Sequence, residues 1–221
     1  MMIKFIGIFL SNILLISSIV SFSQKLPPGA IKVKELNAFI DQYEVTNLAW
    51  LEYLFWLKDK HGENSTEYNN ALPDSAIWYS VYNGQFISQN DFRNHPVVGV
   101  SFGQANKYCE WRSIVVNEKY SKKNKKVIYR LPSLDEFEQL YSIIKPEIKN
   151  EKEIISPVDK LNSNVKVIGL CNNVSEMTST YGIAYGSNWT LKDTICNIKL
   201  NYDKPTNWIG FRSIANFEKL K

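Results

Sequence analysis

Three cysteines are the side chains of this chain best suited to redox chemistry or to binding a soft metal ion. They are Cys109, Cys171 and Cys196, spread over a sequence of 221 residues. A thiolate can act as a nucleophile, bind a metal or form a disulfide. An odd number of cysteines leaves at least one that is free or paired with another molecule. A bridge between Cys171 and Cys196 is open on this evidence, whereas Cys109 is interpreted as a buried thiol on an apolar helix face with Phe102, Ala105 and Ile114.

A serine motif offers a second kind of chemistry. Residues 99–103 read Gly-Val-Ser-Phe-Gly, which is the G-x-S-x-G spacing of the nucleophile elbow in α/β-hydrolases. Such an enzyme needs a histidine after the serine, but the two histidines, His61 and His95, both precede Ser101. The base is missing, so Ser101 is interpreted as a helix cap. Two histidines and three scattered cysteines also lack any recognisable zinc-binding spacing.

Capping patterns locate the helices that would position these residues. An apolar strand over residues 96–100 leads into a helix that begins at Ser101 with the reciprocal Ser-x-x-Gln pattern. A second helix begins at Ser133 with Ser-x-x-Glu. The lysine-rich residues 119–126 between them are interpreted as a solvated loop.

The N-terminal third shows a strand followed by a helix. Residues 38–45 are predicted as a strand, and Thr46 opens a helix that runs to about Lys60 and ends at Gly62. Residues 62–94 are interpreted as a long, partly structured loop. The buried face of the helix is predicted from its aliphatic and phenylalanine residues, Leu48, Leu51, Leu54 and Phe55.

The first residues are typical of a secretory signal peptide. Lys4 precedes an apolar run that is interrupted by serines and ends in small residues before Gln24. The run is shorter than the ~20 apolar residues of a membrane-spanning helix. We expect a signal peptide over residues 1–23 and one domain over residues 24–221, exported to the periplasm or cell surface or secreted. Loss of Lys4 lowers the formal net charge from +4 to +3, too small to indicate a nucleic-acid partner.

Four segments of the sequence resemble the formylglycine-generating enzyme family, also called sulfatase-modifying factors. They are FID and EVTN within residues 39–47, HPVVGVSFGQANKYCEWR at residues 95–112, YRLPSLDEFE at residues 129–138, and the closing GFR at residues 210–212. The resemblance covers about residues 36–216. It implies an α+β fold related to C-type lectins, irregular, with short twisted strands and few helices. Three segments together, PDSAIW at residues 73–78, HPVVGV at 95–100 and CEWRSIVVNE at 109–118, are most similar to the gliding-motility, type IX secretion branch of Bacteroidota.

Enzymes of this family oxidise a substrate cysteine with two cysteines that are separated by four residues and follow a GGS turn. The bacterial enzymes bind copper(I) through both sulfurs, because a soft monovalent ion prefers thiolates. Here Tyr185-Gly186-Ser187 aligns with the turn, and Thr190 and Ile195 take the two cysteine positions, with Cys196 one residue beyond. The resemblance therefore implies no catalytic pair and no copper; if the protein is active, Cys196 is the candidate catalytic residue.

Two further family features can be followed in the sequence. In secreted members, the cysteine that aligns with Cys109 bonds to one directly after the closing GFR, where this chain has Ser213. The segment GLCNNVSEMT aligns with a region that helps to hold a structural calcium ion, so Asn173 and Glu176 are candidate ligands. The alternative is that Asn173 caps a turn and that Glu176 pairs with an arginine, such as Arg130 or Arg212.

The favoured function is therefore an exported, non-catalytic binding or scaffold component of the cell envelope. Its partners would be envelope proteins, in gliding motility or type IX secretion, without a transmembrane helix of its own. The alternative is an oxidase that uses Cys196 in a rearranged thiol site. Carbohydrate binding, by analogy with C-type lectins, is less favoured and would be supported by exposed tryptophans at Trp78, Trp189 and Trp208.

Overall fold

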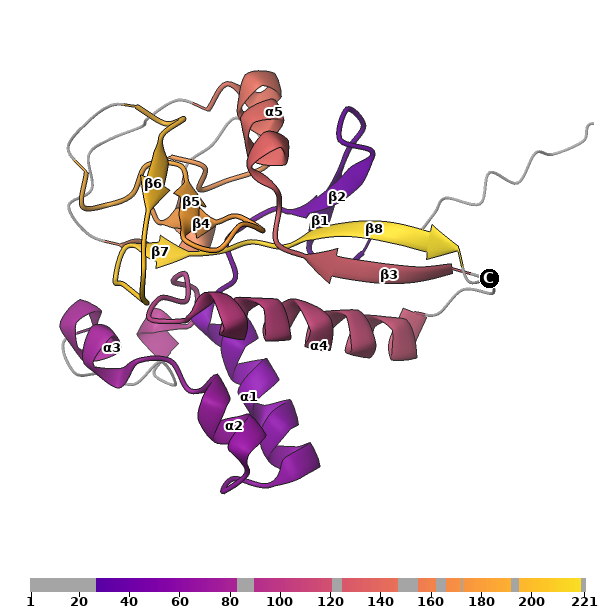
Figure 1. Cartoon of the computed structure of the whole chain (residues 1–221), viewed down its shortest axis with the longest axis vertical. Coiled ribbons are helices and arrows are strands. Elements are labelled where there is room, and N and C mark those ends of the chain that lie inside the picture. The colour runs from indigo at the N-terminus through magenta and orange to yellow at the C-terminus, as the bar shows by residue number, and fades with distance from the viewer. Residues whose placement is uncertain are drawn as a thin grey trace, which may run out of the picture.

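The chain folds into two small β-sheets with helices packed around them (Figure 1). This computed structural model describes residues 27–82, 90–120, 125–146, 155–161, 166–171, 173–191 and 195–219. The expected signal peptide, residues 1–23, lies outside this range. Among the described residues, none of the helices is both long and apolar enough to cross a membrane.

Runs of strands and runs of helices follow one another along the chain, as expected for an α+β protein. In order they are β1 (Ala30–Val33), β2 (Ala38–Asp41), α1 (Asn47–His61), α2 (Thr66–Ala71), α3 (Ser75–Val81), α4 (Phe102–Tyr120), β3 (Lys125–Arg130), α5 (Leu134–Ile144), β4 (Ser175–Met177), β5 (Ile183–Tyr185), β6 (Lys199–Asn201), β7 (Ile209–Gly210) and β8 (Ile214–Lys219). Two short 3₁₀ turns lie at Asn90–Phe92 and Val158–Lys160.

The first sheet is antiparallel, with strand order β1-β2-β8-β3. Helix α4 runs along one face and α5 lies on the other (Figure 1). The middle strand β2 is buried at all four positions because it is covered on both faces: Phe39 joins the core beneath α4, and Ile40 joins the core beneath α5. The predicted strand at residues 38–45 is thus confirmed over its first half. Successive side chains of β2 point to opposite faces of the sheet and therefore enter two different cores.

The second sheet has strand order β6-β5-β4-β7, with β4 and β7 parallel and the other pairs antiparallel. It joins segments that are distant in sequence, since Ser175 in β4 is the partner of Ile209 in β7. The family turn at residues 185–187 therefore lies near the closing residues 210–212.

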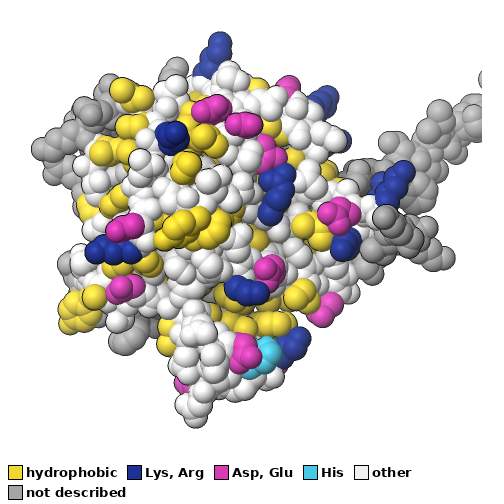
Figure 2. Space-filling view, in the orientation of Figure 1, with side chains coloured by type: hydrophobic (Ala, Val, Ile, Leu, Met, Phe, Trp, Pro, Cys, Tyr) yellow, Lys and Arg dark blue, Asp and Glu magenta, His cyan; other side chains and the backbone are white. Residues whose placement is uncertain are grey.

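On the face shown in Figure 2, Lys and Arg side chains are interspersed with Asp and Glu.

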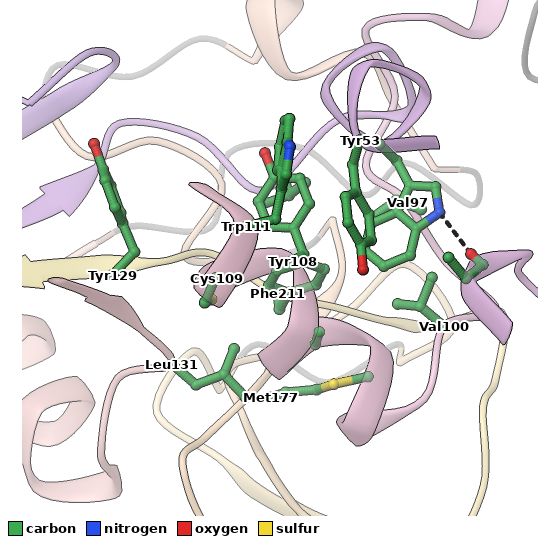
Figure 3. Close-up of a cluster of buried hydrophobic side chains, with 14 of the residues drawn as sticks. Tyr53, Val97, Val100, Tyr108, Cys109, Trp111, Tyr129, Leu131, Met177 and Phe211 are labelled. Carbon is green, nitrogen blue, oxygen red and sulfur yellow. Dashed lines mark hydrogen bonds between the residues drawn. The ribbon is translucent and has the colours of Figure 1, made fainter. Parts of the chain in front are cut away.

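An aromatic cluster joins α1, α4 and the C-terminal segment (Figure 3). The Trp50 ring is fully buried, stacks on Tyr108 with 5.5 Å between ring centroids, and meets Phe211 edge-on at 6.0 Å. Its indole N–H donates to the Ala71 carbonyl oxygen at 3.2 Å, which also ties α2 to α1. Large aromatic rings in such arrangements supply much of the burial energy of a core.

Helix α1 confirms the predicted start and end but not the predicted face. The Thr46 hydroxyl accepts from the Ala49 amide, and the helix ends at Gly62. Its buried face, however, carries Trp50, Tyr53, Leu54 and Leu57, whereas Phe55 is 73% exposed and Leu48 is 39% exposed. The predicted face is thus confirmed for Leu54 and wrong for Leu48 and Phe55, because the larger aromatic rings pack against α4 and set the rotation of the helix.

Both predicted capping boxes are confirmed. The Ser101 amide donates to Gln104 Oε1 at 2.7 Å and the Gln104 amide donates to Ser101 Oγ at 3.2 Å, at the start of α4. Ser133 and Glu136 make the same reciprocal pair at the start of α5. These contacts span three residues, so the local sequence suffices to specify them.

Three other sequence-based predictions need correction. Residues 96–100 are buried but form no strand, because their amides bond to single crossing segments: Val97 donates to Val45 O and Gly99 donates to Thr206 O. Residues 62–94 hold helices α2 and α3, capped by the side chains of Ser65 and Asp74. At the end of the lysine-rich segment, Lys125 and Lys126 belong to β3 because that strand pairs along its whole length with β8.

Candidate functional site

The turn after β5 holds Thr190, which by sequence resemblance aligns with the first of the two cysteines of the family enzymes. Asn188 organises the turn: its Oδ1 accepts from the Thr190 amide at 3.0 Å and from the Thr190 hydroxyl at 2.6 Å. Its Nδ2 donates to Ser175 Oγ at 2.9 Å, which anchors the turn to β4. Thr190 is therefore an exposed turn residue whose hydroxyl is engaged by its neighbour.

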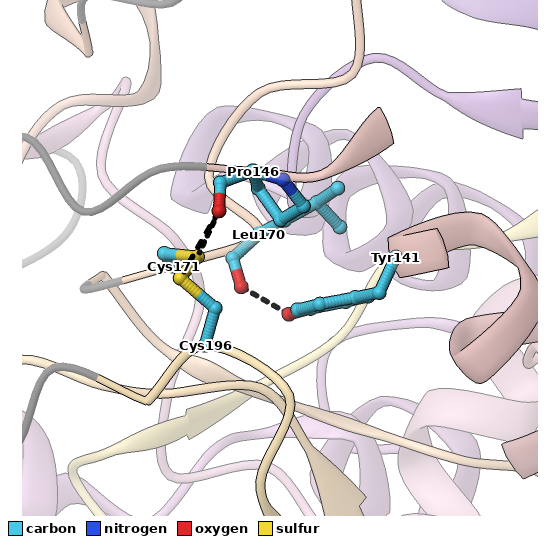
Figure 4. Close-up of a disulfide and its surroundings, with 5 residues drawn as sticks. All are labelled: Tyr141, Pro146, Leu170, Cys171 and Cys196. Atoms are coloured by element: carbon cyan, nitrogen blue, oxygen red, sulfur yellow. Dashed lines mark hydrogen bonds between the residues drawn. A yellow bond between two sulfur atoms is a disulfide. The ribbon is translucent and has the colours of Figure 1, made fainter. Parts of the chain in front are cut away.

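The second position is followed by a disulfide. Cys196 is bonded to Cys171, with 5.0 Å between the Cα atoms (Figure 4). The two sulfurs lie 3.4 and 3.8 Å from the Pro146 carbonyl oxygen, just after α5. Ile195, at the family position itself, is 54% exposed. The bridge that the sequence left open is thus present, and Cys196, the candidate catalytic residue, carries no free thiol in this structure.

The third cysteine lies in the α4 core (Figure 3). Cys109 is 2% exposed, and burial raises the pKa of its thiol to about 12. Its Sγ lies 3.7 Å from the Ser213 hydroxyl oxygen, the place where secreted relatives carry the second cysteine of a bridge. The interpretation of Cys109 as a buried free thiol is confirmed. Of its predicted apolar neighbours, Ala105 is buried but Ile114 is 45% exposed, because it points away on the next turn of α4.

A cavity of about 650 Å³ adjoins the disulfide. Its wall includes Tyr141, Lys145, Tyr185, Cys196 and Lys199, from α5, β5 and β6. The Tyr141 hydroxyl points to the Leu170 carbonyl oxygen and donates a hydrogen bond to it (Figure 4). The Cys196 sulfur is therefore beside open space, although it is bonded to Cys171.

A fully buried arginine joins the two sheets. The guanidinium of Arg212 is held by both carboxylate oxygens of Glu176, at 2.5 and 2.8 Å, and by main-chain oxygens of Asp41 and Ile168 at 3.1 and 2.8 Å. Two parallel N–H to oxygen bonds are the strongest form of such a pair. The alternative in which Glu176 pairs with Arg212 is confirmed, while Arg130 pairs with Glu136 instead.

A second buried carboxylate, Glu44, lies beside this pair. Its Oε2 is 4.0 Å from Arg212 and has no hydrogen-bond partner among the described residues, while Oε1 accepts from Asn173 at 3.0 Å. Burial, followed by the nearby Glu176 charge, outweighs the attraction of Arg212 and raises the pKa of Glu44 to about 8. Gly169, with φ of +81°, allows the backbone to pass directly against this carboxylate.

The candidate calcium ligands are brought together but are engaged elsewhere. Asn173 Oδ1 accepts from the Ser156 amide at 3.0 Å, and both oxygens of Glu176 are taken by Arg212. A guanidinium at this distance would also repel a divalent cation. Over the described part of the chain, no cluster of three or more His, Cys, Asp and Glu side chains could hold a metal ion. As placed, these residues do not fit a calcium ion.

Sequence reasoning missed Glu44 as a member of this cluster. Its segment EVTN was used only as a family signature and as the start of α1. The available signal was its position: a charged residue between an apolar strand and a capped helix is expected to be buried, and a buried carboxylate requires a partner. The three tryptophans proposed for carbohydrate binding are half-buried, and the indole N–H groups of Trp78 and Trp189 donate to main-chain oxygens.

The fold of this chain has counterparts among solved structures. A solved structure, "Treponema denticola variable protein 1", is similar over 80% of this chain and 84% of that chain, with a TM-score of 0.52 and 16% sequence identity. At that identity the likeness shows the fold alone, which is the α+β fold of formylglycine-generating enzymes, related to C-type lectins. The structure titled "Structure of PvdO from Pseudomonas aeruginosa" aligns over 83% of this chain and 80% of that chain, with a TM-score of 0.45 and 14% identity.

The family follows from the sequence comparison. Residues 18–142 match the family described as the sulfatase-modifying factor enzyme 1-like domain. Because this match spans more than half of the chain, the protein belongs to the sulfatase-modifying factor family. The matched stretch contains the segments at 39–47, 95–112 and 129–138 and ends before the Cys171–Cys196 bridge. No curated protein matches the chain.

Proposed function

We propose that this protein is an exported, non-catalytic binding or scaffold module of the sulfatase-modifying factor family that acts in the cell envelope. The observation that carries the proposal is the state of the three sulfurs. Cys171 and Cys196 are bonded to each other, and Cys109 is buried in the core with a raised pKa. A copper(I) oxidase of this family needs two thiolates that face a substrate, and neither arrangement supplies them.

The residues at the two reactive positions support the same proposal. The Thr190 hydroxyl is occupied in a turn, and the Ile195 side chain has no group that could bind copper. The surrounding framework is nonetheless complete, from the capped helices to the Arg212 cluster. A framework kept without its reactive sulfurs is what a binding module requires.

The finer part of the proposal concerns location and partners. The N-terminal residues 1–23 favour export, and the PDSAIW segment favours the gliding-motility and type IX secretion branch. The partners would then be envelope proteins. A pull-down of the tagged full-length chain from the envelope fraction of its own cells tests this: recovery of secretion or motility components supports it, and a protein recovered alone from that fraction contradicts it.

An aldehyde assay tests the absence of catalysis. Purified protein would be incubated with copper(I), oxygen and a cysteine-containing sulfatase peptide, with and without prior reduction, and aldehyde would be measured by mass spectrometry. We expect no conversion of cysteine to formylglycine in either state. Conversion that survives in Cys109→Ser but disappears in Cys196→Ser would overturn the proposal.

That outcome would establish the second candidate, an oxidase that uses Cys196 in a rearranged site. One observation favours it: Cys196 lines the cavity of about 650 Å³ beside α5, so reduction of the bridge would place a thiol at a space large enough for a peptide side chain. The Cys109→Ser variant is the matched control because it removes a thiol from the core and leaves the cavity unchanged.

A further inference from the structure

A second cavity, of about 560 Å³, lies on the opposite side of the molecule from the disulfide, between α1, α2 and α4. In Figure 2 hydrophobic side chains form a recess below the charged side chains of α4 and above the ends of α1 and α2. This volume suits one side chain of a ligand together with its neighbouring backbone. The cavity is lined by Ser101, whose hydroxyl caps α4, but by none of the three cysteines and neither of the calcium-binding candidates Asn173 and Glu176.

Three aromatic side chains form one wall of this cavity. They are Tyr53 and Trp56 on α1 and Trp111 on α4. The Tyr53 and Trp111 ring centroids are 5.1 Å apart and the Trp56 and Trp111 centroids are 6.5 Å apart, so the rings lie as close neighbours at angles to one another. We call Tyr53, Trp56 and Trp111 the aromatic wall.

Two carboxylates also line the cavity. Glu67 on α2 and Glu110 on α4 are both exposed at the cavity, and Lys107 is the one lysine that lines it. Lys107 Nζ lies 2.8 Å from Glu110 Oε2, so among the side chains that line the cavity Glu110 is paired with a lysine and Glu67 is not. Burial raises the pKa of Tyr53 to about 12, and the Glu110 charge adds to the effect, which indicates that this carboxylate acts on the aromatic wall.

The chemistry of the aromatic wall already attracts a cation. Lys60 Nζ lies 4.5 Å from the centroid of the Trp56 ring, within the range of a cation–π contact. A ligand with a basic side chain would offer a cation of the same kind to the rings that line the cavity.

We propose that this cavity binds an arginine side chain presented by a partner protein. The planar guanidinium stacks on indole rings and can bond to carboxylates, which suits it better than lysine to a cavity lined by Trp and Tyr rings together with Glu67 and Glu110. Arginine is also among the residues most enriched at binding hot spots. The inference deepens the proposed function and rests on it, because it names the chemistry that a binding module would recognise.

The test compares two peptides that differ only in charge. Acetyl-Gly-Arg-Gly-amide and the same peptide with citrulline, which is neutral and of the same shape, would be titrated into the full-length protein by calorimetry. We expect the arginine peptide to bind about tenfold more tightly, the scale of a partly desolvated cation–π contact with a carboxylate. Equal affinity for the two peptides, or no binding of either, would overturn the proposal.

Variants of the residues that line the cavity show how much of the affinity for the arginine peptide comes from the carboxylates and how much from the aromatic wall. Trp56→Ala should abolish binding, and Glu67→Gln and Glu110→Gln should each weaken it severalfold. Lys107→Ala frees the Glu110 carboxylate and should strengthen binding. The control, Ile114→Ala, removes an exposed apolar lining residue and should change affinity less than twofold.

The alternatives give distinct results. A saccharide site would bind neutral sugars, and Glu67→Gln and Lys107→Ala would change their affinity in the same direction. An apolar site would bind the arginine and citrulline peptides equally. Either outcome overturns the proposal. Circular dichroism of each variant verifies folding. Because the aldehyde assay probes Cys196 and the titration probes Trp56, failure of one inference is visible without failure of the other.

Discussion

Replacement of Glu44 by glutamine should make the protein more stable at alkaline pH. Glu44 and Glu176 share one buried positive charge, that of Arg212, and Glu176 holds it through both oxygens. The three side chains are electrically neutral together only when one carboxyl group is protonated. Glu44 takes the proton because its Oε2 makes no hydrogen bond among the described residues, and its pKa rises to about 8.

The sign and size of the effect follow from the two pKa values of Glu44. Its pKa is 4.5 in the unfolded chain and about 8 in the folded protein, so the folded state binds the proton more tightly. The stability that Glu44 contributes is fully present below pH 4.5 and is lost as the pH rises through 8. At about 1.4 kcal/mol per pH unit, the interval between these values corresponds to at most roughly 5 kcal/mol.

Glutamine has nearly the shape of the protonated carboxyl group and can still accept from Asn173, but it does not titrate. We therefore expect Glu44→Gln to match the wild type near pH 5 and to exceed it by roughly 3–5 kcal/mol near pH 8.5. The free energy of unfolding would be measured by urea titration at intervals from pH 5 to pH 9 under non-reducing conditions.

A surface variant provides the control for this measurement. Glu218→Gln removes a carboxylate from the exposed end of β8, where it pairs loosely with Lys126 at 3.7 Å. It should run parallel to the wild type across the whole pH range. If Glu44→Gln also runs parallel to the wild type, Glu44 is ionised throughout and the neutral three-residue cluster is refuted.

Three further predictions test the core, the lost bridge and the metal. Ser213→Cys should form a disulfide with Cys109, because the Cys109 sulfur is 3.7 Å from the Ser213 hydroxyl oxygen. The bridge would join residues separated by 104 positions and should add about 3–4 kcal/mol to the free energy of unfolding. Intact mass and non-reducing urea titration detect the bridge, and two free thiols in this variant would contradict the prediction. Leu57→Ala should cost about 2–4 kcal/mol, whereas Phe55→Ser on the same helix should change stability by under about 0.5 kcal/mol. Calcium and EDTA should leave the melting temperature equal; a calcium-dependent rise that Asn173→Ala abolishes would instead establish the site.

Local contacts are the part of this fold that could be predicted most fully from the sequence. The caps at Thr46, Ser101 and Ser133 each join a side chain to an amide three residues away, so a short window contains every atom involved. The start and end of α1 were predicted for the same reason. The face of α1 was not, because it depends on which side chains of α4 lie opposite, and that information is outside the helix.

The candidate site likewise has features that the sequence predicts and features that only the folded structure shows. The absence of cysteine at positions 190 and 195 is a property of the sequence, and it already argues against a copper-binding thiol pair. Whether Cys171 and Cys196 bond to each other depends on a Cα separation that the sequence does not contain. The same holds for Glu44, which is ordinary in the linear chain and becomes exceptional only where Arg212 and Glu176 enclose it.

What the sequence alone determined is the family, the helix boundaries set by local hydrogen bonds, and the absence of cysteine at positions 190 and 195. The tertiary structure decided the rotation of α1, the bridge between Cys171 and Cys196, the protonation of Glu44 and the aromatic wall beside Glu67 and Glu110. The physical reason is distance: local hydrogen bonds join neighbours along the chain, whereas burial, charge pairing and disulfide formation depend on atoms that only folding brings together.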